Sequence, residues 1–126
     1  MSLRTSLPFK SAEIKDFWVG VANKKLLAQE CKNCGEKFFP PSNHCPKCLS
    51  KDFKWFSLSG KGKLYSWTHI LYTSTPHFVG IIDIEEGFSR IISRVRTDGK
   101  IPKIGDRVEV SFFVFENEPL FEFKLI

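Results

Sequence analysis

The chain has 126 residues, of which 42% are hydrophobic and 26% charged, as is typical of a soluble globular protein. No run approaches the roughly 18 apolar residues of a membrane-spanning helix, and the first residues lack the apolar core of a secretory signal. We therefore expect a cytoplasmic protein with no membrane contact, in which paired cysteines more often hold a metal than form disulfides.

The formal net charge of +5 raises the question of nucleic-acid binding. Residues 1–59 contain ten Lys/Arg and five Asp/Glu, whereas residues 60–126 contain nine of each. The whole excess therefore lies in the first half, and four thiolates around one Zn²⁺ would remove part of it. This is a weak electrostatic pattern for a protein that follows a phosphate backbone.

Residues 11–25 are predicted to form a helix, because Ile14, Phe17, Trp18 and Val21 recur with the spacing of one helical face. Two interpretations of this apolar stripe stay open. It packs on the rest of the chain, or Phe17 and Trp18 contact a partner.

Two Cys-x-x-Cys pairs lie ten residues apart, at Cys31 and Cys34 and at Cys45 and Cys48. A two-residue spacer lets one tight turn aim both sulfurs at the same point, and Gly35 suits a backbone position with positive φ. Two such turns complete a closed tetrahedron of thiolates, which predicts one structural zinc.

The alternatives to zinc are two disulfides, a redox Cys-x-x-Cys, and iron bound as in rubredoxins. His44 adjoins Cys45 and is a weaker candidate ligand. The segment that contains the four cysteines, residues 26–59, has few aliphatic residues and therefore needs the metal in order to fold. We therefore interpret the zinc as structural and not catalytic.

From residue 61 onward the sequence predicts β-strands, because runs of β-branched and aromatic residues alternate with Gly, Pro and Asn turns. The predicted strands are 64–73, 78–84, 88–95, 107–115 and 120–126. Five short strands suit a small closed barrel of the OB type. The fold class is mainly β, with an N-terminal helical segment (1–25), a zinc ribbon (26–59) and a five-stranded OB barrel (60–126).

Two groups of basic residues are candidate contacts for an anionic ligand. Lys61 and Lys63 follow Ser59 and Gly60, where the alternative is a flexible joint and bulge that opens the first barrel strand. The second group lies on one predicted strand and consists of Arg90, Arg94 and Arg96, where the alternative is a solvated face with salt bridges.

The sequence predicts no catalytic residue. His69 is expected mid-strand, on the same face as Tyr65 and Trp67, as a packing residue. In the strand at 107–115, Val108, Val110, Phe112 and Val114 are expected to line the barrel. Phe113 and Phe115 then point outward, where they are candidates for a partner interface.

Several motifs together resemble an acyl-CoA-associated zinc-ribbon/OB-fold family, also known as domain-of-unknown-function family thirty-five. They are the Cys-x-x-Cys-Gly and Cys-Pro-x-Cys knuckles, Phe39-Pro40-Pro41, the Ser-Gly-x-Gly joint, Leu64-Tyr65-Ser66-Trp67-Thr68 and Ile104-Gly105-Asp106-Arg107-Val108. The resemblance runs from about residue 10 to residue 126. One departure is Leu49, because a glycine or other small residue is common near that position.

The resemblance implies a rubredoxin-like ribbon joined to an OB barrel, with zinc on Cys31, Cys34, Cys45 and Cys48. It also implies association with thiolases and 3-hydroxy-3-methylglutaryl-CoA synthase, which the small protein bridges without catalysing a reaction. We therefore expect a non-enzymatic accessory or scaffold protein of thiolase-type enzymes. Either this chain contacts acyl-CoA itself, or only its partner enzymes do. The alternative is a nucleic-acid-binding zinc-ribbon/OB module.

Overall fold

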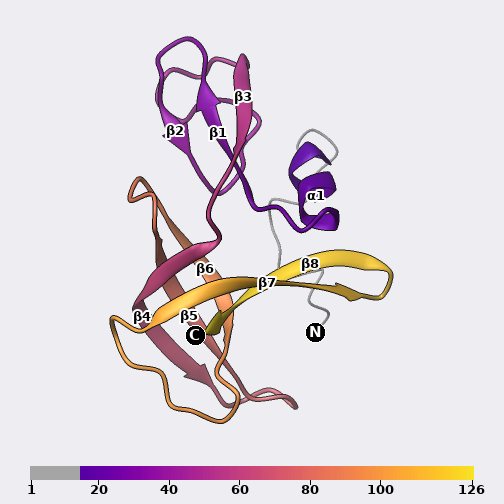
Figure 1. Cartoon of the computed structure of the whole chain (residues 1–126), viewed down its shortest axis with the longest axis vertical. Helices are drawn as coiled ribbons and strands as arrows, with labels where there is room; N and C mark the ends of the chain where they lie inside the picture. The colour runs from indigo at the N-terminus through magenta and orange to yellow at the C-terminus, as the bar shows by residue number, and fades with distance from the viewer. Residues whose placement is uncertain (1–14) are drawn as a thin grey trace. The chain divides into compact units, whose positions relative to one another are not determined.

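The structure is a computed structural model that describes residues 15–126 (Figure 1). Its elements, in chain order, are α1 (Lys15–Ala22), β1 (Leu27–Cys31), β2 (Lys37–Phe38), β3 (Phe53–Ser57), β4 (Lys61–Ile70), β5 (His77–Ile84), β6 (Arg90–Arg96), β7 (Arg107–Phe115) and β8 (Glu118–Leu125). The start of the predicted helix, residues 11–14, lies outside the described residues. Among those described, no helix is long and apolar enough to cross a membrane.

The chain divides into two compact units. The first extends to Leu58 and also includes Phe112–Leu120, and the second comprises Ser59–Ser111 and Phe121–Ile126. The expected boundary between ribbon and barrel, at 59/60, lies next to this division.

Helix α1 ends earlier than the sequence predicts. Lys24 has a positive φ of 61°, and the backbone N–H of Lys25 donates to the carbonyl of Gly20 at 2.8 Å. Helices commonly end with a residue in the left-handed conformation, followed by an N–H group that donates to the carbonyl five residues earlier. A lysine in place of the usual glycine leaves little signal for the end of the helix in the sequence.

The apolar stripe of α1 packs inside its own chain. Phe17 is 0% and Trp18 7% exposed. Their rings meet edge to face at a centroid separation of 5.1 Å, and Phe17 lies 6.3 Å from the ring of Phe39. The interpretation of Phe17 and Trp18 as partner contacts is therefore wrong, because neither side chain is accessible.

The first unit contains a three-stranded sheet in the order β2-β1-β3, with both pairs antiparallel. Gln29 at its centre faces Phe38 of β2 on one side and Trp55 of β3 on the other. The sequence does not predict these strands separately, because they are short and lie among the metal-binding turns.

The other five strands close into a barrel in the order β4-β5-β6-β8-β7. The β6–β8 pair is parallel, whereas β5 pairs antiparallel with β4 and with β6. Leu64, Ile82, Val108 and Phe123 are at most 1% exposed and form its centre. The predicted fold class, mainly β with a short helix, a ribbon and a five-stranded OB barrel, is confirmed.

A β-bulge interrupts β4 between Leu64 and Ser66. It places Tyr65 under the guanidinium of Arg90, 3.8 Å from the ring centroid, whereas Trp67 and His69 both contact Phe78 of β5. The expectation that Tyr65, Trp67 and His69 share a face is therefore wrong, because an extra residue shifts the alternation by one.

His69 is exposed, and its ring contacts a neighbouring strand. Its ring stacks on that of Phe78 with a centroid separation of 4.1 Å and an interplanar angle of 16°.

Strand β7 lines the barrel only in its first half. Val108 is buried and Val110 and Phe112 are half-buried, but Val114 is 71% exposed. The expectation that Val114 lines the barrel is wrong, because Val114 belongs to the stretch Phe112–Leu120, which is grouped with the first unit and not with the barrel core.

Candidate functional site

The four predicted ligands meet at one point in the first unit. The sulfurs of Cys31, Cys34, Cys45 and Cys48 all lie within 4.8 Å of one another. The Cys31–Cys48 and Cys34–Cys45 Sγ separations are both 3.6 Å. A disulfide requires about 2.05 Å, so these thiols are free. His44 is exposed and is not part of the cluster.

The two knuckles have the same backbone geometry. In the first, the N–H of Gly35 donates to the carbonyl of Cys31 at 3.0 Å, and in the second the N–H of Leu49 donates to that of Cys45 at 2.9 Å. Gly35 and Leu49 both have positive φ, 79° and 65°. Each turn thus ends on a left-handed residue one position after its second cysteine.

Backbone amides point at the sulfurs from inside each turn. The N–H groups of Asn33 and Cys34 donate to the sulfur of Cys31 at 3.3 and 3.4 Å, and that of Lys47 donates to Cys45 at 3.4 Å. Such donors stabilise negative charge on sulfur. They favour thiolates, the form that binds metal.

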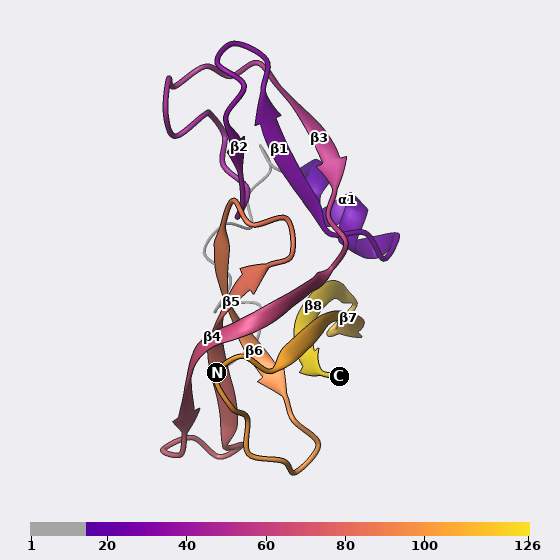
Figure 2. The same cartoon turned by 60° about the vertical axis from the view of Figure 1, so that its left-hand side comes forward.

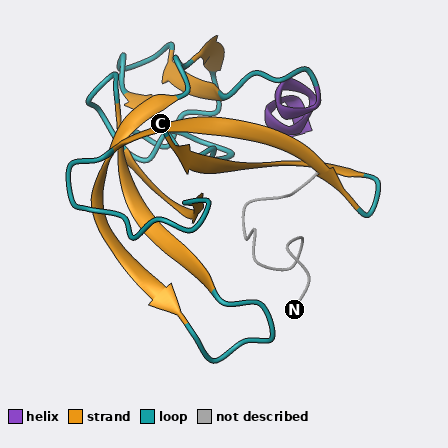
Figure 3. Cartoon of the chain, turned by 60° about the horizontal axis from the view of Figure 1, so that its bottom comes forward, coloured by secondary structure: helices purple, strands orange, loops and turns teal. Residues whose placement is uncertain are grey.

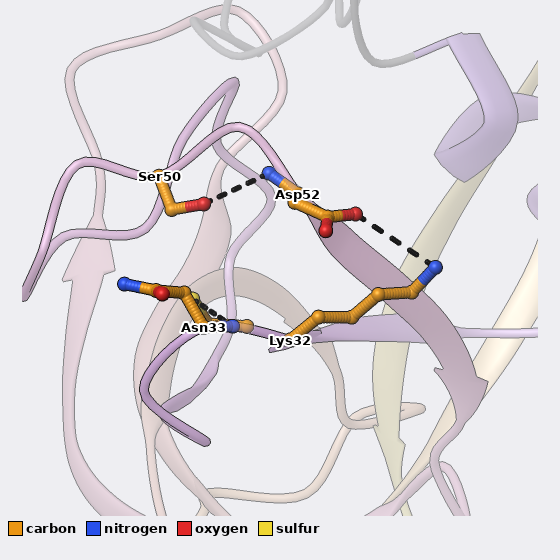
Figure 4. Close-up of polar contacts among 5 residues, drawn as sticks. Lys32, Asn33, Ser50 and Asp52 are labelled. Atoms are coloured by element: carbon orange, nitrogen blue, oxygen red, sulfur yellow. Dashed lines mark hydrogen bonds and ion pairs between the residues drawn. The ribbon is translucent and has the colours of Figure 1, made fainter.

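Two side-chain contacts bring the knuckles together (Figure 4). Lys32, inside the first knuckle, forms an ion pair with Asp52 at 3.8 Å, and the N–H of Asp52 donates to the hydroxyl of Ser50 at 3.1 Å. The amide nitrogen Nδ2 of Asn33 also lies 3.5 Å from the sulfur of Cys48. The two residues between the cysteines of the first knuckle therefore contact the second knuckle and the segment that follows it.

The thiols of Cys34 and Cys48 have opposite pKa shifts. The Asn33 side chain, then the Ser50 amide, lower the pKa of Cys48 to about 6. The Glu36 amide favours the Cys34 thiolate, but partial desolvation and the three neighbouring sulfurs together raise the pKa of Cys34 to about 12. Crowded thiols cannot all ionise unless a cation offsets their repulsion.

This donor set fits zinc. Four thiolates at Zn–S distances of about 2.3 Å lie about 3.8 Å apart in a tetrahedron, which agrees with sulfurs all within 4.8 Å of one another. Cysteines fill every position, so the metal has no open position for water or substrate. The cluster is the site of one structural zinc.

Gln29 supports the site in a way that the sequence did not reveal. It is fully buried, and its side chain donates to the carbonyl of Ser42 at 2.7 Å and accepts from the Ser42 N–H at 2.8 Å. This two-bond clamp fixes the loop before Cys45. A buried glutamine on a short strand leaves no periodic signal in a single sequence.

Two of the three candidate arginines on β6 are occupied within the chain. Arg90 pairs with Asp83 as well as stacking over Tyr65, and the contact with Asp83 raises the pKa of its guanidinium. The guanidinium of Arg96 forms ion pairs with two carboxylates, at 3.8 Å from Nε to Asp98 Oδ1 and at 3.7 Å from Nη1 to Glu122 Oε1. Arg94, half-buried, has no ion pair among the described residues. The alternative of a salt-bridged face therefore describes Arg90 and Arg96.

Lys61 opens the first barrel strand, β4, and Lys63 follows on the same strand. Both lysines line a cavity of about 500 Å³ on the barrel. Arg107 adds a third cation, but Asp83 and Glu85 also line the cavity. Three cations and two acids give only a weak net attraction for anions.

The other two interface candidates lie near the tip of the β7–β8 hairpin. Phe113 is half-buried, and Phe115 is 38% exposed. Of the two, Phe115 is the one that solvent reaches.

Comparison with known proteins agrees with both the ribbon and the barrel. Residues 18–54 match the family described as ChsH2, rubredoxin-like zinc ribbon domain, and residues 55–113 match ChsH2, C-terminal OB-fold domain. A DUF35 domain-containing scaffold protein of Methanothermobacter thermautotrophicus is 35% identical, over 69% of this chain and 71% of that protein. The chain belongs to the DUF35 family.

Further relatives carry two kinds of name. A DUF35 domain-containing scaffold protein of Methanocaldococcus jannaschii is 39% identical over 56% of this chain. The benzoylsuccinyl-CoA thiolase subunit BbsA of Thauera aromatica is 32% identical over 68%. The chain spans 54% and 62% of these two relatives' lengths.

A solved structure, the Ltp2-ChsH2(DUF35) aldolase, has the same fold. Its TM-score is 0.76 at 22% identity, with 94% of this chain and 98% of that chain covered.

Proposed function

We propose that this protein is a non-catalytic accessory subunit of a thiolase-type acyl-CoA enzyme. The observation that carries the proposal is family membership, together with relatives that are named scaffold proteins and a thiolase subunit. The closed zinc site supports the non-catalytic part, because four cysteines leave the metal no position at which to activate water.

The chemistry of the described residues agrees with such a role. His69 stacks on Phe78, and Arg90 and Arg96 are held by acids, so these groups pack and pair within the chain. The zinc ribbon and the closed barrel are each ordered units that can offer a surface to another protein. For acyl-CoA, we predict a contact at the cavity beside Lys61 and Lys63, whose cations can meet phosphate groups.

For the protein contact, we keep the tip of the β7–β8 hairpin as a candidate. Val114 and Phe115 are 71% and 38% exposed there. Neighbouring exposed apolar side chains are typical of an interface core.

Turnover measurements test the proposed function. The purified chain alone should show no thiolytic or condensing activity on acyl-CoA substrates. A thiolase-type enzyme isolated with the chain should lose activity or stability when the chain is removed, and regain it when zinc-loaded chain is added back. Turnover by the chain alone, abolished by His69→Ala with the fold intact, would contradict the proposal.

A further inference from the structure

The β4–β5 hairpin contains a long segment without charge. The chain has 19 Lys/Arg and 14 Asp/Glu, yet none of them falls in residues 64–82. This segment includes most of β4 and β5 and the loop between them, where Leu71 is 65% and Tyr72 88% exposed. The segment is only partly exposed, but its exposed residues also lack charge, which is unusual for a soluble surface.

One edge of this hairpin has no strand beside it. Strand β4 pairs with β5 along its length, as far as Ile70 opposite His77 (Figure 2). On its other side it pairs with β7 only at residues 61–63, and Leu64 then exchanges backbone hydrogen bonds with the loop at Gly105 and Asp106. Among the described residues, no strand pairs with that side of residues 65–70.

A strand with one free side presents backbone groups to solvent. Every second residue of 65–70 directs its N–H and C=O away from β5. Such an edge is a template for another strand unless charge, proline or a covering element protects it. A β-bulge can also protect an edge, but the bulge at Tyr65 lies where the free edge begins and leaves the residues after it unprotected.

Strand β6 provides an internal comparison. It pairs with β5 over residues 90–95, but on its other side it pairs with β8 only at Val95 and Arg96. Its free part is flanked by Arg90 and Arg94, charges of the kind that protect sheet edges. The β4 edge has no equivalent charge, so within one sheet one edge is protected and the other is open.

Aromatic contacts between β4 and β5 order the open edge. Trp67 and His69 both contact Phe78 across the strand pair, at centroid separations of 5.5 and 4.1 Å. Figure 3 shows β4 and β5 running side by side to the loop that joins them. Because the edge is already ordered, a binding strand would lose little free energy in arranging it.

We infer that residues 65–70 of β4 bind an extended, uncharged strand of the partner protein by adding it to the barrel sheet. The inference rests on the proposed function, because it names a surface, in addition to the hairpin tip, through which the accessory subunit contacts its thiolase-type enzyme. Backbone hydrogen bonds supply the affinity in this mode, and alternate side chains supply the specificity.

The side chains along the β4 edge determine which side chains the added strand should carry. On one face the added strand meets Trp67 and His69, which favour apolar or aromatic side chains. On the other face it meets Ser66 and Thr68, which favour small β-branched residues. A charged strand would gain no opposite charge here and would lose hydration.

Amide hydrogen exchange on the intact complex tests the inference. The complex of full-length, zinc-loaded chain with its thiolase-type enzyme is compared with the free chain. We expect alternate amides in residues 65–70 to exchange about tenfold or more slowly in the complex, because they become hydrogen-bonded to the added strand. Equal exchange rates in the two states would overturn the inference.

A matched set of variants separates the edge from the neighbouring face. Thr68→Arg places a charge on the open edge and should weaken the complex by about tenfold or more, whereas Thr68→Val should bind like the wild type. Ile92→Arg places the same charge on β6, at a side chain that is 70% exposed, and should leave binding unchanged. If Thr68→Arg fails to fold, Ser66→Lys replaces it.

The remaining outcomes are also decisive. Equal losses from Thr68→Arg and Ile92→Arg would place the partner on the sheet face and overturn the edge inference. Concentration-dependent protection of these amides in the free chain would mean that a second copy occupies the edge, which also overturns it. If the wild-type chain forms no complex with a thiolase-type enzyme, the proposed function itself fails. If the complex forms but the amides of residues 65–70 stay unprotected, the edge inference fails while the proposed function stands.

Discussion

Leu49 occupies in the second zinc knuckle the backbone position that Gly35 occupies in the first. Both residues follow a Cys-x-x-Cys pair, both have positive φ, and both donate their N–H to the carbonyl of the first cysteine of the pair. Glycine adopts this conformation freely, whereas a side chain makes it costly. The chain thus carries conformational strain at Leu49.

Leu49→Gly should therefore stabilise the zinc-loaded protein by about 1 kcal/mol. The Leu49 side chain is 69% exposed, so little packing is lost to offset the gain. Equilibrium denaturation in the presence of zinc measures the change. Leu49→Ala is the control, because it shortens the side chain but keeps the Cβ, and it should bring no comparable gain. A loss of stability in the glycine variant would show that this knuckle is not strained.

Gly35→Ala should have the opposite effect, a loss of about 1 kcal/mol, at the matching position of the first knuckle. No atom outside the adjacent residues lies within 4 Å of the Cβ position, so the cost comes from the backbone alone. Zinc affinity should fall along with the free energy of unfolding. An alanine variant as stable as the wild type would contradict the common geometry of the two turns.

Gln29→Leu should destabilise the ribbon by about 2 kcal/mol, because the Ser42 amide and carbonyl then lose their buried partner. The change is measured by denaturation and by the rate of zinc release to a chelator, which should increase as the loop before Cys45 loosens. Gln29→Glu is informative beside it, since the carboxylate keeps an acceptor for the Ser42 N–H but has no donor for its carbonyl. If Gln29→Leu is neutral, the clamp does not hold this loop.

Removing the metal should unfold the ribbon and spare most of the barrel. We expect one zinc per chain by elemental analysis and no visible-region iron spectrum. Chelation, or Cys45→Ser, should abolish amide protection in β1 and β3, while β4–β6 stay protected because the barrel has its own buried core. Zinc should also be lost as the pH falls, because protons compete for the thiolates. One iron per chain, or a barrel that unfolds together with the ribbon, would contradict this account.

The two aromatic residues near the β7–β8 tip should respond differently to truncation. Phe113→Ala removes a half-buried ring and should cost about 2 kcal/mol of stability. Phe115→Ala removes a more exposed ring and should leave the free energy of unfolding nearly unchanged, but weaken co-purification with the enzyme. A stable double mutant that still binds every partner of the wild type would remove the tip from the interface.

The sequence predicted the parts of this structure that have a local pattern. The cysteine spacing defined the metal cluster, and alternation with turn residues located all five barrel strands. The face of Tyr65 was predicted wrongly because a bulge adds one residue to β4 without any marker such as glycine. The end of α1 was missed for a similar reason, since Lys24 is left-handed without being a glycine.

What the sequence missed depends on contacts between distant residues. Gln29 acquires its role only when Ser42 lies against it, and Asn33 acquires one only when Cys48 of the other knuckle approaches. The sequence allowed salt bridges for the candidate arginines but could not name their partners, because Asp83 and Glu122 come from other strands. Side-chain pairing across a barrel follows from register, which a single sequence does not give.

Native mass spectrometry of the tagged chain, purified from its native host at physiological salt, tests the central claim most directly. The account predicts a stoichiometric complex of the zinc-loaded chain with a thiolase-type acyl-CoA enzyme, identified by peptide sequencing, and no bound nucleic acid. Recovery of the chain without any such enzyme, or bound tightly to RNA or DNA in its place, would contradict the assignment as an accessory subunit.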